Sequence, residues 1–208
     1  MTTPRVGLID YGMGNLHSVR KALEKVGASV EIIRENTGSN SSFDRLVLPG
    51  VGSLGDCMHC LLRNGLDELV KDWIANDRPF LGICLGMQAL FDRSEENNAA
   101  GLGIFSGVVM QFRLDHPFKV PHIGWNQVEF HGTPDPLSKG LSRADDQFYF
   151  DHSFCVVPED PSLIWGTTHH GTTFVSAIRK GNCFATQFHP EKSQAKGLTL
   201  FRNFVQQL

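Results

Sequence analysis

The stretch of sequence that decides the fold is Pro79-Phe80-Leu81-Gly82-Ile83-Cys84-Leu85-Gly86-Met87-Gln88. Its apolar first half indicates a buried strand, and residues 85–91 favour a helix. Cys84 therefore falls on the turn between strand and helix, with Gly82 and Gly86 two positions away on either side. This is the spacing of the G-x-S-x-G nucleophile elbow, with cysteine in place of serine. Because the start of a helix stabilises a negative charge, the pattern predicts a reactive thiolate at Cys84.

A motif near the C-terminus offers a base for this cysteine. In Phe188-His189-Pro190-Glu191, we expect a short strand that begins at Cys183 to deliver His189 at its end, with Glu191 two residues later. A catalytic cysteine needs a base and a third group that orients the base, and the three need only meet in space. Each motif is weak alone, because buried structural cysteines and solvated histidines are both common. Together they predict Cys84 as nucleophile, His189 as base and Glu191 as the orienting carboxylate.

Length and composition indicate one soluble domain that spans residues 1–208. Hydrophobic residues make up 41% of the chain and charged residues 20%, and the net charge of -3 favours neither nucleic acid nor an anionic membrane as a partner. No apolar run approaches the roughly 18 residues that cross a bilayer, and Met1 to Arg5 lead directly into a predicted strand. Five cysteines are an odd number without an export signal, so we expect a reducing, cytoplasmic location.

Strands and helices alternate through the N-terminal half. Strands are expected at Val6 to Asp10, Val30 to Ile33 and Leu46 to Leu48. Apolar residues recur at helical spacing from Leu16 to Val26 and from Leu66 to Ile74. Such alternation predicts a parallel sheet that helices cover on both faces.

The C-terminal half is rich in short strands instead. We expect them at residues 108–112, 125–130, 148–150, 154–157, 164–167 and 174–178, before a closing helix near residues 198–205. No linker or internal repeat divides the chain. The predicted fold class is α/β, a single domain with a central, mostly parallel sheet flanked by helices and a strand-rich C-terminal half.

The loop Pro49-Gly50-Val51-Gly52 follows the third predicted strand and is a candidate oxyanion hole. Attack of a thiolate on an amide gives a tetrahedral oxyanion, which needs preorganised N–H donors. One donor is expected from Leu85, directly after the nucleophile, and a second from Val51 or Gly52. The glycines let the backbone approach a ligand and let the Val51 peptide reorient. The alternative is an ordinary loop after a strand.

Two other motifs favour structural roles. Gly12-Met13-Gly14-Asn15 lacks the third glycine of a dinucleotide fingerprint, because His17 stands in its place. Cys57-Met58-His59-Cys60 has no second cysteine pair to complete a zinc site, and its two cysteines are expected to share one face of a helix. We therefore predict no metal and no cofactor.

Taken together, these motifs resemble the class I glutamine amidotransferase family. The similarity rests on Gly82 to Gln88 and Phe188 to Glu191, and it extends in the same order over Asp10 to Leu16, Leu48 to Gly52, Pro121 to Asn126 and Gln187 to Ser193. Within that family, the chain is most similar to the glutaminase subunits of imidazole glycerol phosphate synthase. The resemblance implies the family's fold and a Cys-His-Glu triad formed by Cys84, His189 and Glu191.

The resemblance also implies a reaction and a partner. Glutamine would be hydrolysed to glutamate and ammonia. Ammonia would pass to a (β/α)8-barrel cyclase subunit of a heterodimer that makes imidazole glycerol phosphate and aminoimidazole carboxamide ribotide in histidine biosynthesis. The residues assigned to glutamine binding are Gly50, Gln88, His152, Ser153 and Phe154, and those near the subunit interface are Asn15, Trp125 and Lys192.

Three alternatives stay open at this point. The same chemistry could feed a different acceptor, such as a sugar amidination system. The chain could be a catalytically silent binding subunit, or a cysteine peptidase built on a similar elbow. Two departures from the family bear on substrate contacts and partner coupling: Asp151 stands where an apolar residue is usual, and Phe154 where tyrosine is frequent.

Overall fold

Five parallel strands make up the centre of the sheet, and the elbow strand is one of them. The computed structural model describes residues 3–38, 42–132 and 136–208. The strands are β1 (Arg5–Ile9), β2 (Ser29–Ile33), β3 (Arg45–Gly50), β4 (Phe80–Cys84) and β13 (Cys183–Thr186). They lie in the order β2-β1-β3-β4-β13, and every neighbouring pair is parallel. β3 pairs with β4 so that Gly50 lies beside Cys84, which brings the predicted oxyanion loop next to the elbow.

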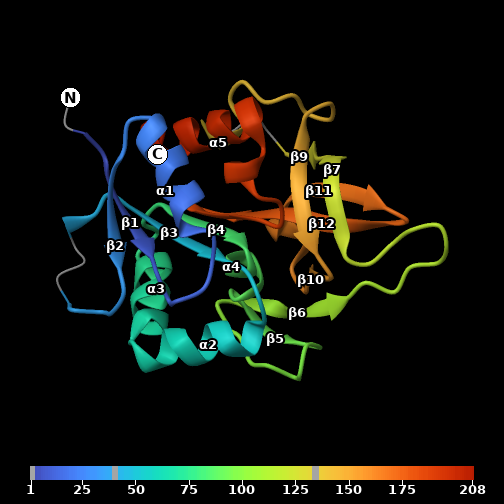
Figure 1. The fold of residues 1–208 in the computed structure, drawn as a ribbon, viewed down its shortest axis with the longest axis horizontal. Helices are drawn as coiled ribbons and strands as arrows, with labels where there is room; N and C mark the ends of the chain where they lie inside the picture. The colour runs from blue at the N-terminus through green and yellow to red at the C-terminus, as the bar shows by residue number, and fades with distance from the viewer. Residues whose placement is uncertain (1–2, 39–41, 133–135) are drawn as a thin grey trace.

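The later strands extend this sheet with mostly antiparallel pairing. They are β5 (Phe91–Ser94), β6 (Phe105–Gln111), β8 (Glu129–Phe130), β10 (Phe154–Pro158), β11 (Ile164–His170) and β12 (Thr172–Lys180). From β13 the sheet continues through β12, β10, β6 and β5, while β11 and β8 branch from β12. A separate antiparallel pair, β7 (His122–Gln127) and β9 (Gln147–His152), runs across the large sheet in the view of Figure 1. The mostly parallel sheet predicted from the sequence is confirmed for its central part.

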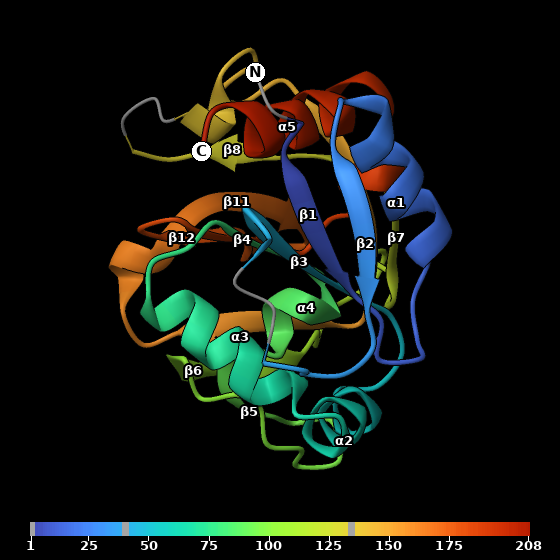
Figure 2. The same ribbon diagram turned by 90° about the vertical axis from the view of Figure 1, so that its left-hand side faces the viewer.

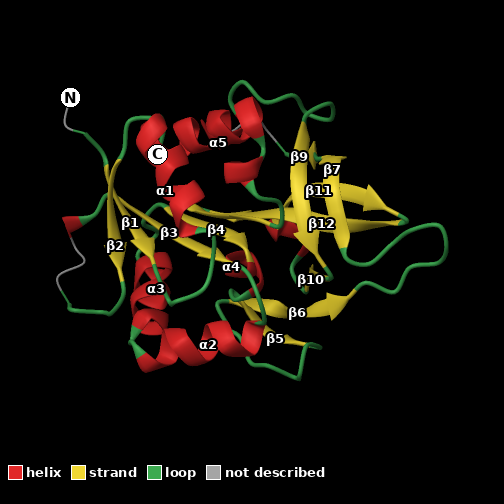
Figure 3. Ribbon diagram, in the orientation of Figure 1, coloured by secondary structure: helices red, strands yellow, loops and turns green. Residues whose placement is uncertain are grey.

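Helices cover both faces of the sheet, as Figures 1 and 2 show. One face carries α1 (Leu16–Lys25) and α5 (Gln194–Gln206), and the other carries α2 (Leu54–Arg63), α3 (Leu66–Ala75) and the short α4 (Leu85–Gln88). Among the residues described in the second half of the chain, three 3₁₀ turns occur: η2 (Pro136–Ser138), η3 (Pro161–Leu163) and η4 (Pro190–Lys192). Each face has its own apolar core, one containing Leu23 and Phe201 and the other Leu61 and Trp73. Figure 3 shows the resulting layers of helix, strand and helix.

The elbow helix is shorter than the sequence indicated. The prediction of a helix through Phe91 was wrong, because α4 ends at Gln88 and Phe91 begins β5. The following loop turns back, and the N–H groups of residues 101–104 donate to carbonyls of residues 89–92, as in the 2.8 Å bond from the Leu102 N–H to the Ala89 oxygen. In a longer helix, those carbonyls would accept hydrogen bonds from within the helix. Here they pair with a later segment, and this pairing overrides the local preference for a helix.

Two predicted strands also differ from the observed ones. Residues 125–130 are not one strand, because β7 pairs with β9 in the small sheet whereas β8 pairs with β11 in the large sheet. The fully buried Val128 marks the change between them. In addition, β13 ends at Thr186, and His189 is held by an isolated bridge to Tyr149 instead of lying at the end of that strand.

Candidate active site

Cys84 lies on a strained turn between β4 and α4. Its backbone angles, φ 54° and ψ -106°, fall in a region that residues other than glycine rarely adopt. A Cβ atom on Gly86 would lie 1.9 Å from the Leu48 carbonyl oxygen, and one on Gly82 would lie 2.8 Å from the Gly86 oxygen. Because neither distance admits a side chain, the spacing of glycines around Cys84 is a steric requirement of the turn.

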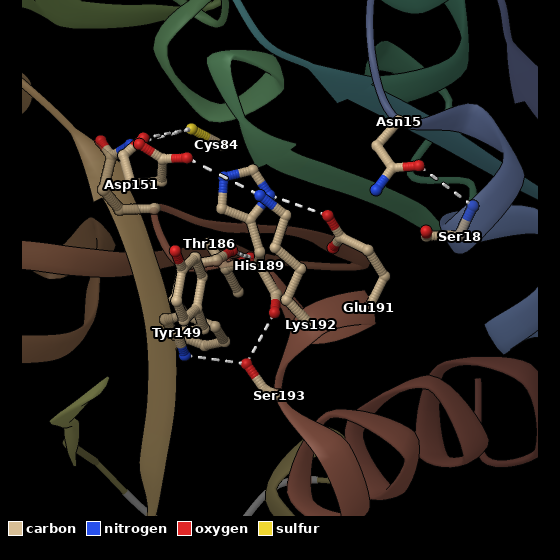
Figure 4. A network of polar contacts seen from close by, with 12 residues as sticks. Asn15, Ser18, Cys84, Tyr149, Asp151, Thr186, His189, Glu191, Lys192 and Ser193 are labelled. Atoms are coloured by element: carbon tan, nitrogen blue, oxygen red, sulfur yellow. Dashed lines mark hydrogen bonds and ion pairs between the residues drawn. The ribbon is translucent and has the colours of Figure 1, made fainter. Parts of the chain in front are cut away.

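His189 and Glu191 meet Cys84 beyond the carboxyl ends of the parallel strands β4 and β13 (Figure 4). The His189 Nδ1–H donates to Glu191 Oε1 over 2.8 Å, and the two side chains are only 3% and 2% exposed. The other ring nitrogen, Nε2, is buried on the side of the Cys84 thiol and forms no hydrogen bond of normal geometry with the described residues. The fold thus brings Cys84 together with a histidine and a glutamate that follow it by more than a hundred positions.

The charges around His189 govern its protonation. Burial by itself lowers the pKa of the imidazole, but the Cys84 sulfur and the Glu191 carboxylate prevail and raise the pKa to about 10. His189 therefore holds its proton at neutral pH, with one N–H directed to the carboxylate and the other to the sulfur. An imidazolium beside a thiolate is the charge arrangement that cysteine nucleophiles use.

The backbone of His189 is held on both sides. Its N–H donates to the Tyr149 carbonyl over 2.8 Å, and its own carbonyl accepts a 2.6 Å bond from the buried Ser193 hydroxyl. The Ser193 oxygen also accepts from the Tyr149 N–H at 3.0 Å. Strand β9 and the residue that follows η4 therefore hold the backbone of His189, and Figure 4 shows the Ser193 hydroxyl between Tyr149 and the His189 carbonyl.

One residue that the sequence analysis did not single out contacts the sulfur directly. The Gln187 Nε2–H donates to Cys84 Sγ over 3.5 Å, and Gln187 Oε1 accepts a 3.1 Å bond from Gln88 Nε2. Gln187 is fully buried, so its amide has fixed neighbours. A glutamine two positions before His189, at the end of a predicted strand, was the available signal. The contact positions the sulfur beside the cavity.

A cavity of about 330 Å³ opens beside the sulfur, within the size range of small-molecule sites. Its walls include the predicted residues Val51, Gly52, Cys84, Leu85, Gln88, His152, Ser153 and Phe154. Glu96, Pro121 and Asp151 line it as well, although the sequence analysis did not assign them to substrate binding. Gly50, which the resemblance assigned to glutamine binding, is buried and is not among the lining residues.

His152 is an uncharged part of the cavity wall. Burial lowers its pKa to about 3, and burial also lowers the pKa of the neighbouring His122 to about 4. The His152 Nδ1–H donates to the Phe154 carbonyl over 2.8 Å, which leaves Nε2 to accept from His122 Nδ1 at 3.1 Å. The Phe154 carbonyl also accepts from Gln88 at 3.1 Å, so His152 and Gln88 together hold this part of the cavity wall. Because both ring nitrogens of His152 already have partners, His152 is not a second base.

The Val51 N–H of the oxyanion loop does not donate into the cavity in this conformation. Val51 and Gly52 border the cavity beside Cys84, and Gly52 has a φ of 94° that suits glycine. The Val51 N–H, however, faces the hydroxyl oxygen of the buried Tyr11, which is not among the cavity residues. Of the predicted donors, the Leu85 N–H lies at the start of α4. The Val51 N–H would have to turn towards the cavity before it could donate to an oxyanion.

The three interface candidates occupy different surroundings. Asn15 caps α1, since its Oδ1 accepts the Ser18 N–H over 3.3 Å. Trp125 is 45% exposed on β7, and its ring stands edge-on to that of Tyr149 at 6.1 Å. The Lys192 ammonium lies 5.2 Å from the centre of the same tyrosine ring and 3.7 Å from the Asp151 carboxylate. Trp125 and Lys192 therefore share one surface around Tyr149.

Within residues 3–38, 42–132 and 136–208, no group of three or more histidine, cysteine, aspartate or glutamate side chains is placed to hold a metal ion. The five cysteines are free, and both Cys57 and Cys60 lie on α2, as predicted. No helix in this part of the chain has the length and apolar character needed to span a membrane.

Comparison with known proteins matches nearly the whole chain to one family. A sequence model described as glutamine amidotransferase class-I matches residues 7–208. The protein named imidazole glycerol phosphate synthase subunit HisH from Acinetobacter baylyi is 47% identical, over 97% of this chain and 98% of that protein. The protein named imidazole glycerol phosphate synthase subunit HisH 1 from Pseudomonas aeruginosa is 46% identical, over 96% of this chain and 95% of that protein.

Solved structures agree on the fold. The structure of PurLQS from Thermotoga maritima superposes with a TM-score of 0.77 at 18% identity, covering 98% of each chain. A glutamine amidotransferase from Thermotoga maritima gives a TM-score of 0.66 at 16% identity, covering 92% of this chain and 77% of that one. At these identities the likeness supports the architecture alone.

Proposed function

This chain belongs to the class I glutamine amidotransferase family, and from that premise we propose that it is the glutaminase subunit of an imidazole glycerol phosphate synthase. The observation that carries the proposal is that Cys84 lines a cavity and lies beside the hydrogen-bonded pair of His189 and Glu191, within a chain similar over its full length to such subunits. The reaction is hydrolysis of glutamine to glutamate and ammonia.

The first step uses the ion pair of Cys84 and His189. The thiolate attacks the side-chain amide carbon of glutamine and forms the C–S bond. His189, protonated at neutral pH, gives its Nε2 proton to the departing nitrogen, so the C–N bond breaks and ammonia leaves. Glu191 holds the imidazole in the orientation that this transfer needs.

The second step reverses the roles. Neutral His189 takes a proton from water, the hydroxide adds to the thioester carbon, and the C–S bond breaks to release glutamate. Thiolate and imidazolium are restored together, as microscopic reversibility requires. The same imidazole thus serves as acid and then as base.

The charges of the cavity support an amino acid as substrate. Among the lining residues that the structure describes, the charged side chains are Glu96 and Asp151, both acidic. Glu96 is anchored because its Oε2 accepts the Leu54 N–H over 2.8 Å. We assign the α-ammonium group of glutamine to the Glu96 end of the cavity, which leaves the amide at Cys84.

Partner binding and the oxyanion loop belong to the same proposal. In a synthase the chain functions in a complex with a second subunit, which we propose is a (β/α)8-barrel cyclase in a heterodimer. The exposed Trp125 offers an aromatic contact of the kind enriched at interfaces, and the nearby Lys192 adds a positive charge to the same surface. We propose that the partner favours a turned Val51 peptide, so that its N–H enters the cavity.

Glutamate release from glutamine tests this function. It is measured with the purified chain alone and with the cyclase together with its nucleotide substrate. We expect slow hydrolysis by the chain alone and a severalfold rise in the complex, because the Val51 N–H is turned away in the free chain. Peptide cleavage without glutamine hydrolysis would identify a peptidase, and inactivity under every condition would identify a silent subunit.

Glu191→Gln is expected to shift the pH profile of hydrolysis. The carboxylate helps to raise the pKa of His189 to about 10, and the amide cannot, so the pKa falls in the variant. Because the first step needs protonated His189, the alkaline limb of kcat/KM moves to lower pH. The measurement is kcat/KM from pH 6 to 10.5 with the normal protein and the variant in parallel. An alkaline limb at the same pH in both proteins would contradict the role assigned to Glu191.

A further inference from the structure

Tyr11 is a buried group that the proposed mechanism does not use. It lies two residues beyond the end of β1 and is 3% exposed. Its hydroxyl has no hydrogen-bond partner of normal geometry among the described residues. A buried hydroxyl without a partner is costly and uncommon in folded proteins, so it calls for a physical account.

The hydroxyl lies against the oxyanion loop. A Cβ atom on Gly50 would stand 2.4 Å from Tyr11 Oη, so only glycine at that position lets the phenol approach the backbone. Next along the same loop, the Met13 methyl group lies 2.5 Å from where a Cβ on Gly52 would be. The β1–α1 loop and the oxyanion loop therefore pack directly on each other.

The polar neighbours of this hydroxyl are the Cys57 thiol and the Val51 N–H. Neither forms a well-directed hydrogen bond with it. Burial, with a smaller contribution from Cys57, raises the pKa of Tyr11 far above its usual value, so the phenol keeps its proton. The group can therefore always donate, and in this conformation its side-chain neighbour is the Cys57 sulfur, which is a weak acceptor.

We propose that Tyr11 is a positioning residue whose hydroxyl donates to the Gly50 carbonyl when the Gly50–Val51 peptide turns. The C=O and N–H of one planar trans peptide point in opposite directions. A turn that sends the Val51 N–H into the cavity therefore brings the Gly50 carbonyl towards the phenol. The bond stabilises the donating form of the loop over the resting form. The inference rests on the proposed glutaminase function and names the group that supports its oxyanion hole.

The loop that carries Tyr11 leads directly to Asn15, the cap of α1 and an interface candidate. A partner seated on Asn15 would thus contact the same short segment that contacts the oxyanion loop. This continuity gives a physical route by which the partner subunit could favour the turned peptide.

Tyr11→Phe removes the hydroxyl and keeps the ring. In the complex with the cyclase we expect kcat for glutamine hydrolysis to fall about tenfold with KM unchanged, since the oxyanion forms only after binding. The rate at which iodoacetamide alkylates Cys84, followed by mass spectrometry of its peptide, should not change. Alkylation is a direct displacement at carbon that forms no oxyanion. Its rate therefore depends on the reactivity of the Cys84 sulfur and not on the oxyanion hole.

Cys57→Ala is the matched control, because it removes the other side-chain neighbour of the hydroxyl. It should leave kcat unchanged. An unaltered kcat in Tyr11→Phe would overturn the proposal, and so would an equal loss in Cys57→Ala or a parallel loss of Cys84 alkylation. If the unaltered complex hydrolyses no glutamine, it is the proposed function that fails, whatever Tyr11 does.

Discussion

The Cys84→Ala variant is expected to lose glutamine hydrolysis by a factor of at least about 10⁴, because no other group near the cavity can form the thioester. The remaining described cysteines cannot substitute. None of Cys57, Cys60, Cys155 and Cys183 borders the cavity, and burial raises the pKa of the Cys57 thiol to about 12. The measurement is glutamate release by the complex under saturating glutamine.

The control for this variant is synthesis by the same complex with ammonium salt in place of glutamine. Ammonia supplied from solution bypasses Cys84, so this activity should be kept if the subunits still assemble. His189→Ala should match Cys84→Ala in the glutamine assay, since residues that act as one unit show non-additive losses. Glutamine hydrolysis that survives in Cys84→Ala would exclude this cysteine as the nucleophile.

Gly86→Ala is expected to lower the stability of the fold strongly. The new Cβ would lie 1.9 Å from the Leu48 carbonyl oxygen and 3.0 Å from its carbon, and both belong to the backbone of the central strand β3. Backbone atoms in a paired strand cannot move aside as a side chain can. We expect the free energy of unfolding to fall by about 3 kcal/mol or more, measured by urea denaturation.

Gly55→Ala provides the matched control in α2. A Cβ there would meet its nearest neighbour, the Ala99 Cβ, at 3.8 Å, an ordinary contact. Alanine also favours a helix more than glycine does, so the free energy of unfolding should stay the same or rise by up to about 1 kcal/mol. Equal losses in the two variants would contradict the steric account of the elbow.

Some parts of the site could be predicted because their requirements are local. The turn at Cys84 needs small residues at Gly82 and Gly86, and the two close contacts of those glycines are the physical reason. Helix α1 begins at its Asn15 cap and ends before Gly27 for equally local reasons. The extent of α4 was misjudged because hydrogen bonds from residues 101–104 decide where it ends.

By itself, the sequence determined the elbow, the alternation of strands and helices, and the residue types of a Cys-His-Glu site, since steric and helix-forming preferences act between near neighbours. The tertiary structure alone decided that β4 and β13 lie side by side, and hence which distant groups surround the sulfur. Gln187 contacts Cys84 across 103 positions of sequence. Tyr11, which follows β1, contacts the oxyanion loop that follows β3, although β2 lies between these strands in the sequence. Such contacts depend on strand order, which no local pattern specifies.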